Sequence, residues 1–215
     1  GDVSVTNLNL GKIVHEKDLE SNINGDFIVD ARGFDYATAT GKLDYKLGRT
    51  KFLGQNISRS EGRLNFNRGN VGLDLSYDSE AIRTKAKGKI NISNLKNITY
   101  DVNGTVSGLN IASFTKDNSM LSDLNFDFEL KGSGFDPNVM EGNYKISMNE
   151  STFADLTIPA MPLEIDIDKN GIIKKVSMIS DIADLNVEGA FDFSSLVNSI
   201  NSNIEKITSE FKARL

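Results

Sequence analysis

The segment of this chain that comes nearest to a ligand site is Asp166-Ile-Asp-Lys-Asn-Gly171. Its D-x-D-x-N-G spacing matches the start of an EF-hand loop, in which carboxylate and amide oxygens hold Ca²⁺. That loop also needs a bidentate Glu at its last position, and Ser177 stands there instead. Ile165 and Ile167 alternate with the two aspartates, which favours a strand followed by a hairpin turn. A small calcium-stabilised module therefore remains only a minor hypothesis.

Other residues that could do chemistry lack the partners that chemistry requires. His15 is the only histidine, and there is no cysteine to share a metal ion with it or to act as a thiolate. No serine can be matched with a histidine and a paired acid, so no catalytic triad is available. The carboxylates of Asp26/Asp30 and Asp127/Glu129 alternate with apolar residues, which is typical of a solvated strand face. We expect no enzyme, no cofactor and no metal site.

Composition points to many short strands joined by tight turns. Of 215 residues, 39% are hydrophobic and 8% aromatic, with 18 Gly, 3 Pro and no Trp. The formal net charge of -6, without a Lys/Arg cluster, argues against binding to nucleic acid or to anionic membrane surfaces. No apolar run is long enough to span a bilayer. The chain begins in a strand-like run, so we interpret it as a segment of a longer protein, with any membrane anchor outside it.

An internal repeat organises the chain. Leu124, Phe126, Phe128 and Leu130 alternate with polar residues, the period-2 pattern of a strand with one apolar face. The same pattern occurs 101 residues earlier. The positions that recur at this offset are Ser21, Asn24, Asp26, Phe27, Gly33, Phe34, Asp35, Gly41 and Phe52, matched by Ser122, Asn125, Asp127, Phe128, Gly134, Phe135, Asp136, Gly142 and Phe153.

The repeat predicts an elongated all-β fold. Two repeats, about 8–92 and 109–193, would form one continuous segment over residues 1–193. We expect about 17 short strands in an antiparallel meander, extending roughly 80 Å at a spacing of 4.8 Å. Residues 194–215 differ, because a 4-4-3-4 spacing of apolar residues predicts an amphipathic C-terminal helix. That stripe comprises Leu196, Ile200, Ile204, Ile207 and Phe211.

Strands with one apolar face allow two architectures. In a closed sandwich or barrel the apolar faces pack on one another. In an open, U-shaped sheet they line a hydrophobic groove that something other than protein fills. The evenly spread, mid-sized apolar residues and the gap-free repeat favour the groove. The residues expected to line it are Leu43, Tyr45, Leu64, Phe66, Leu73, Leu75, Val102, Leu124, Phe126, Phe128, Tyr144, Ile146, Ile165, Ile167, Val187 and Phe191.

The repeated motif resembles the repeats of the TamB and AsmA-like envelope proteins of diderm bacteria. The second repeat carries the resemblance at Ser122, Leu124, Asn125, Gly132, Gly134, Gly142, Ser151, Phe153, Ser180, Gly189 and Phe191. The first repeat matches at Ser21, Asn24, Gly33, Gly41, Phe52, Ser79 and Gly88. It departs from the pattern at Ile23, in place of the Leu, and at Ala31, in place of the first Gly. The motif is degenerate, but it covers the chain up to about Phe193.

The resemblance implies a β-taco, a long sheet folded around a hydrophobic groove, in a protein that is anchored in the inner membrane and crosses the periplasm. It implies passage of phospholipid acyl chains towards the outer membrane. It also implies a role in outer-membrane protein assembly with a barrel partner that would dock outside this segment. Flanking segments of the same chain would be further partners. The alternative function is a structural or adhesive β-sandwich or solenoid module with a closed core and no lipid.

Overall fold

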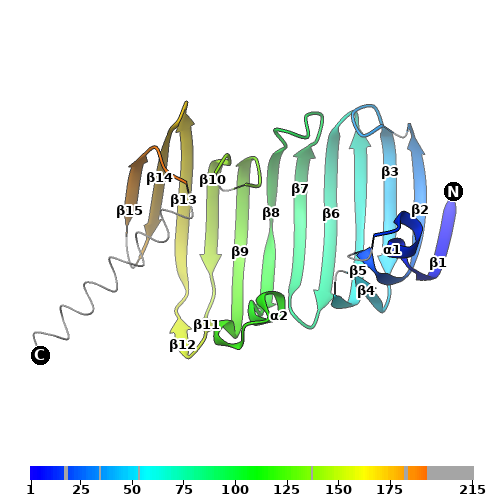
Figure 1. The fold of residues 1–215 in the computed structure, drawn as a ribbon, viewed down its shortest axis with the longest axis horizontal. Coiled ribbons are helices and arrows are strands. Elements are labelled where there is room, and N and C mark those ends of the chain that lie inside the picture. The colour runs from blue at the N-terminus through cyan, green and yellow to red at the C-terminus, as the bar shows by residue number, and fades with distance from the viewer. Residues whose placement is uncertain (17–18, 34, 53, 137, 182–183, 193–215) are drawn as a thin grey trace, which may run out of the picture.

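Period-2 patterning along almost the whole chain gives one large antiparallel sheet. The computed structural model describes residues 1–16, 19–33, 35–52, 54–136, 138–181 and 184–192. All 15 strands of these residues belong to a single sheet. Twelve of them lie side by side in the order β1-β2-β3-β5-β6-β7-β8-β9-β10-β13-β14-β15 (Figure 1). The predicted all-β, elongated, antiparallel fold is confirmed.

The elements follow one another as a meander with short helices between some strands. The first half comprises β1 (Asp2–Leu8), α1 (Leu10–Val14), β2 (Ser21–Arg32), β3 (Thr40–Leu47), β4 (Thr50–Phe52), β5 (Gln55–Asn67), β6 (Asn70–Ser79) and β7 (Arg83–Asn91). The second half comprises β8 (Thr99–Leu109), α2 (Ala112–Thr115), the 3-10 helix η2 (Asn118–Met120), β9 (Ser122–Ser133), β10 (Glu141–Met148), β11 (Ser151–Phe153), β12 (Leu156–Ile158), β13 (Met161–Asn170), β14 (Ile173–Ser180) and β15 (Leu185–Gly189).

The bounds of the strands repeat at the offset seen in the sequence. β2 and β9, β3 and β10, and β4 and β11 begin and end 101 residues apart. β5 corresponds to β12 and β13 together, and β1 and α1 correspond to β8 and α2. The two copies therefore lie along one sheet as successive turns of the same meander, in the left and right halves of Figure 1.

The described residues form fewer strands than the 17 or so expected. They have 15, and β4, β11 and β12 are short pieces beside the ends of longer strands. Twelve strands side by side extend roughly 50 Å at the usual spacing, less than the length expected from the sequence. The strand-like run at the start of the chain ends as β1 at Leu8, and helix α1 begins at Leu10. The predicted helix at 194–215 lies outside the described residues.

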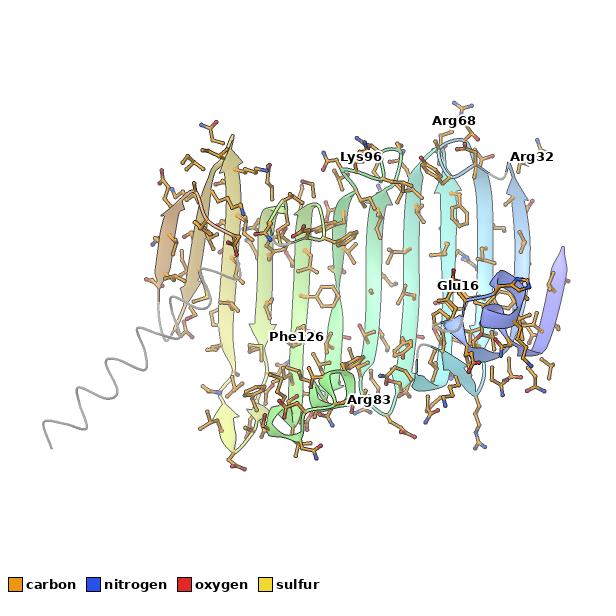
Figure 2. The ribbon with its side chains drawn as sticks, viewed as in Figure 1. Glu16, Arg32, Arg68, Arg83, Lys96 and Phe126 are labelled. Atoms are coloured by element: carbon orange, nitrogen blue, oxygen red, sulfur yellow. The ribbon has the colours of Figure 1, made fainter. Side chains whose placement is uncertain are left out.

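The sheet is a single layer, and this overturns the closed sandwich. No large side chain of the described residues is fully buried. Figure 1 shows the strands spread side by side, with α1 and α2 in front of one end of them. We call that end, which also carries β4, β11 and β12, the lower rim, and the opposite end the upper rim. Arg32, Arg68 and Lys96 mark the upper rim in Figure 2.

Candidate functional site

The strand registers place the predicted groove residues on one face, which we call the apolar face. Directly paired residues of neighbouring strands point to the same side of a sheet. One row across the sheet is Val29, Leu43, Leu64, Leu73, Gly88, Val102, Leu130, Tyr144, Ile165, Met178 and Leu185. The row below it is Phe27, Tyr45, Gly62, Leu75, Ala86, Gly104, Phe128, Ile146 and Leu163.

The remaining predicted residues fall in the rows on either side. Phe66, Ile167 and Val187 belong to the next row towards the upper rim. Phe126 and Leu124 lie towards the lower rim on β9, where Leu124 pairs with Leu109. Phe191 follows the end of β15. All predicted strand residues therefore share a face, because the period of two is kept within each strand and the registers keep it between strands.

Large side chains on the apolar face lie across glycines of the neighbouring strands. A Cβ placed on Gly62 would come within 2.9 Å of the ring of Tyr45, and one on Gly104 within 2.7 Å of the ring of Phe128. Sequence analysis missed these glycines as parts of the face. The signal was a Gly at an apolar position of the alternation, opposite an aromatic residue in the register. Rings that rest over glycines make the face more even than its residue sizes suggest.

Most of the apolar face is not covered by any element of the described residues. Its side chains are half-buried by their lateral neighbours, and Val29 remains 38% exposed. At the lower rim, α2 adds a partial cover, because Phe114 lines a hollow of about 490 Å³ together with Phe52, Ile57 and Tyr77. Between the rims, Figure 2 shows side chains on this face without an overlying element.

A local core closes the apolar face at the upper rim of β8, β10, β13 and β14. Tyr144, Ile167 and Val176 are buried there, and Tyr100, Leu130, Met140, Ile165 and Phe191 pack against them. Phe135, from the connection between β9 and β10, stacks on Tyr100 with ring centroids 5.1 Å apart. Of the predicted groove residues, Tyr144, Ile165, Ile167 and Phe191 belong to this packed cluster.

Two tyrosines hold this cluster together. The phenol oxygens of Tyr100 and Tyr144 lie 2.9 Å apart. Tyr100 donates to the carbonyl oxygen of Gly134 at 3.0 Å, so the single proton of Tyr144 serves either the contact with Tyr100 or the carbonyl oxygen of Glu141, which lies 3.2 Å away. Burial raises the pKa of Tyr144 well above its usual value, and the hydrogen bond with Tyr100 raises it further.

Lys174 is a cation on the apolar face that sequence analysis did not single out. Its position on β14 has the same parity as Val176, and it is 8% exposed. Its Nζ donates to the carbonyl oxygen of Phe191 at 2.8 Å and to Oδ1 of Asn138 at 3.3 Å. The same nitrogen lies 5.6 Å from the centroid of the Phe191 ring. Lys174 therefore fixes the residues after β15 against the sheet.

The polar motif residues of the repeat are structural parts of the lower rim. The hydroxyl of Ser21 accepts from the amide of Leu10 at 2.8 Å, and Ser122 accepts from that of Ile111 at the same distance. Asn24 and Asn125 receive equivalent bonds, since their side-chain oxygens accept from the amides of Asn7 and Gly108, both at 2.9 Å. Asn7 and Gly108 have positive φ values of 55° and 66°. The Ser/Asn pair thus holds an irregular turn of the preceding strand.

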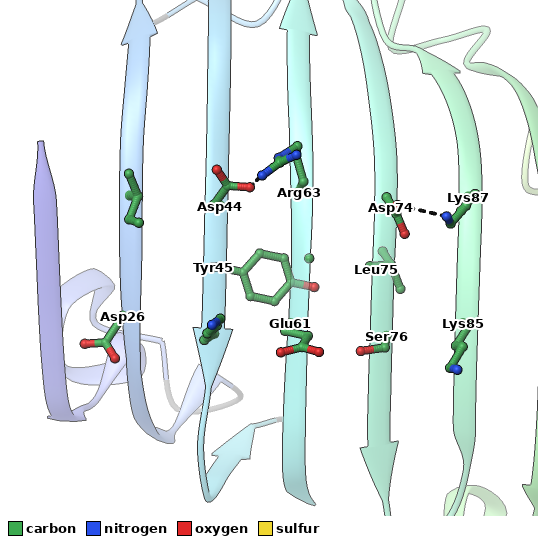
Figure 3. Close-up of a pocket in the computed structure, with 13 residues that line it drawn as sticks. Asp26, Asp44, Tyr45, Glu61, Arg63, Asp74, Leu75, Ser76, Lys85 and Lys87 are labelled. Carbon is green, nitrogen blue, oxygen red and sulfur yellow. Dashed lines mark hydrogen bonds and ion pairs between the residues drawn. The ribbon is translucent and has the colours of Figure 1, made fainter.

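The opposite face, which we call the polar face, carries cross-strand charge pairs. Figure 3 views it with the strand order of Figure 1 reversed and shows Asp44 paired with Arg63 and Asp74 paired with Lys87. These residues line a broad, shallow hollow of about 840 Å³. The Asp44 hydrogen bond raises the pKa of Arg63, and the Arg59 hydrogen bond lowers that of Glu61. Exposed pairs of this kind contribute little to stability.

The calcium motif forms a strand and a tight turn. Asp166 and Asp168 lie within β13, and the register pairs Asp166 with Ser177 and Asn170 with Ile173, leaving Gly171 and Ile172 as the turn. Asp166 already accepts a 2.7 Å hydrogen bond from the side-chain nitrogen of Asn143. Among the residues that the structure describes, no group of three or more His, Cys, Asp or Glu side chains could hold a metal ion.

No helix within the described ranges is long and apolar enough to cross a membrane. Comparisons of the chain with protein-family models, with curated proteins and with solved structures found no match.

Proposed function

We propose that this chain is a segment of a periplasm-spanning envelope protein whose apolar face holds phospholipid acyl chains and lets them move between the inner and outer membranes. One observation carries the proposal: an apolar face continues from β2 to β15, and no layer of the described residues covers its middle. Exposed apolar patches of this extent are typical of binding surfaces. The family resemblance supports the envelope location and a barrel partner in outer-membrane protein assembly.

The chemistry of the face suits an acyl chain. Its central rows contain Leu, Val, Ile, Phe, Tyr, Ala and Gly, with no charged side chain between Val29 and Leu185 in the paired row. Burial of each methylene group contributes about 0.8 kcal/mol, so even a partly covered chain gains several kcal/mol. Headgroups would remain in water at a rim, beyond the outermost apolar rows.

The repetition of the face favours movement over fixed binding. Neighbouring strands lie about 4.8 Å apart and present similar apolar residues. An acyl chain that moves by one strand therefore exchanges one set of contacts for a similar set. Aromatic rings lie over Gly62 and Gly104, which makes the surface more even. A more even surface lowers the steric barriers to movement of an acyl chain between neighbouring strands. A closed pocket would instead hold the lipid in one place.

The test compares an arginine substitution on the apolar face with one on the polar face of the neighbouring strand. Phe128→Arg places a charge in the apolar row, whereas Ser147→Arg adds the same side chain on the exposed polar face of the neighbouring strand. Lipid extraction and native mass spectrometry of the purified proteins should find phospholipid on wild type and Ser147→Arg, and at least five-fold less on Phe128→Arg. Far-UV circular dichroism checks that each variant retains its strands.

A second, milder substitution on the apolar face keeps the test informative if Phe128→Arg unfolds the protein. Ile146→Asn puts a smaller polar group in the same row as Phe128, and it should also reduce bound phospholipid. Wild-type protein that carries no phospholipid, even after incubation with vesicles, would contradict the proposal and favour the structural or adhesive module. Equal lipid on all four proteins would show that the apolar face is not the binding surface.

A further inference from the structure

The two edges of the sheet are complementary to each other. Among the residues that the structure describes, β1 pairs only with β2 and β15 only with β14, so each has an edge that no described strand covers. In the repeat, β1 corresponds to β8 and β15 corresponds to β7. Inside the sheet, β7 and β8 are paired antiparallel over nine residues. The open edge of β15 is therefore equivalent to the edge of β7 that binds β8, and the open edge of β1 is equivalent to the edge of β8 that binds β7.

We propose that β1 of one copy of this chain adds to the β15 edge of a second copy, head to tail, in the register of the β7–β8 pair. In that register Val106 opposes Thr84 and Gly104 opposes Ala86. Moved by one repeat, these pairs become Val5 with Leu185 and Val3 with Val187, and both lie on the apolar face. A contact between two different edges does not close on itself, so it continues the sheet from copy to copy.

The backbone of β1 is oriented for this addition. Gly1 and Val29 exchange both backbone hydrogen bonds, the amide of Val29 donating to the carbonyl oxygen of Gly1 at 2.8 Å. Hydrogen-bonded pairs alternate along an antiparallel ladder, so Val3 also bonds to β2, whereas Asp2 and Ser4 turn their backbone groups to the open edge. In the transposed register these two residues meet Glu188 and Asn186.

Side chains across the new contact fit with one exception. Val3 with Val187 is a β-branched cross-strand pair, a favourable type on the apolar face. Asp2 would face Glu188, and like charges directly opposite each other are unfavourable. The equivalent position of Glu188 in the first repeat is Lys87, which is ion-paired with Asp74. Repulsion between Asp2 and Glu188 keeps the association weak, and a change of charge at Glu188 alters its strength.

Single-cysteine variants test the register, because the chain has no cysteine of its own. Val3→Cys protein is mixed with Val187→Cys protein at about 1 mM each, a concentration at which an interaction of only about 4 kcal/mol is half-saturated. After oxidation, non-reducing electrophoresis should show at least ten-fold more dimer from the mixture than from either protein alone. Val3→Cys with Asn186→Cys is the control, since Asn186 is displaced by one residue and lies on the other face.

Two further variants distinguish edge pairing from other contacts. Ser4→Pro removes an amide that points to the open edge and leaves the β1–β2 bonds in place, so it should reduce cross-linking at least five-fold without loss of strand content. Glu188→Lys should increase it several-fold. Val3→Cys dimers that form as readily alone as in the mixture, or equal cross-linking with Val187→Cys and Asn186→Cys, would overturn the proposal, and so would the absence of any dimer.

Discussion

The phenol oxygens of Tyr100 and Tyr144 lie 2.9 Å apart on strands β8 and β10, which β9 separates. The contact is possible because Gly132 of β9 lies between them without a side chain: a Cβ there would come within 2.8 Å of the Tyr144 hydroxyl. The pair joins three strands at the upper rim, where the connection after β9 folds onto the sheet. It therefore fixes the closed end of an otherwise open apolar face.

Removal of the Tyr144 hydroxyl should weaken the upper-rim core. Tyr144→Phe deletes the hydrogen bond that its single proton makes to Tyr100 or to the carbonyl oxygen of Glu141, at an expected cost of about 0.5–1.5 kcal/mol in the free energy of unfolding by urea. Tyr36→Phe is the control, because Tyr36 is 48% exposed and its change should cost less than about 0.5 kcal/mol. Equal effects of the two variants would show that the Tyr100–Tyr144 contact does not stabilise the fold.

Alkaline pH should act through the same residue. The pKa of Tyr144 is raised in the folded protein, mainly by burial, above the ordinary tyrosine value of 10.0. Below that pH both states are protonated and stability is unaffected. Above it the unfolded chain loses the proton first, so the free energy of unfolding falls as pH rises. Urea midpoints between about pH 9 and pH 11 should fall more steeply in wild type than in Tyr144→Phe. Parallel slopes would contradict this assignment.

Ser21 and Ser122 at the lower rim should contribute equally and independently to the free energy of unfolding. The Ser122 hydroxyl accepts from the amide of Ile111 and donates to the carbonyl oxygen of Leu109 at 3.1 Å. Ser122→Ala leaves both backbone groups without this partner and should cost about 1–3 kcal/mol. Ser21→Ala should cost a similar amount, and the double variant should show the sum to within about 0.5 kcal/mol, because the two sites share no partner. Ser147→Ala, on the exposed polar face, is the control.

Glycine substitutions should have opposite signs at two positions. Gly142 has φ 153°, and a Cβ there would lie 2.3 Å from the carbonyl oxygen of Lys131. Gly142→Ala should therefore lower the free energy of unfolding by more than about 2 kcal/mol, because strand β9 must move. At Gly72 the nearest atom to a Cβ is 3.7 Å away, so Gly72→Ala should stabilise the protein by about 0.5–1 kcal/mol. Thermal unfolding of both variants checks the difference in sign.

The turn between β11 and β12 should gain stability from a glycine. Ala154 has φ 50°, a left-handed conformation that costs an L-residue with a side chain about 1 kcal/mol. Its amide donates to the carbonyl oxygen of Leu121 at 2.7 Å, so the backbone is held in this conformation. Ala154→Gly should raise the melting temperature, whereas Ala31→Gly, within β2, should lower it. A lower melting temperature for Ala154→Gly would mean that the turn carries no strain.

Much of the fold can be predicted from local sequence patterns, because these patterns do not depend on tertiary contacts. Alternation along Leu124, Phe126 and Phe128 determines a strand with one apolar face, because side chains of a strand point to opposite sides in turn. Because the sequence repeats at a constant offset of 101 residues, β9 and β10 repeat the strand bounds of β2 and β3. These two facts, with short connections, suffice for an antiparallel meander. The small interruptions that create β4, β11 and β12 have no comparable signal.

What only the tertiary structure decided depends on registers between strands. The sequence places Tyr144 on the apolar face, but its burial follows from Tyr100, Gly132 and Met140, which come from other elements. Lys174 looks like one of two solvated lysines until the residues after β15 fold over it. The sequence also left open whether the apolar face is closed by a second sheet. The pattern of a strand predicts which of its sides is apolar. Only the arrangement of the described strands in one layer shows that no other described element covers the middle of that side.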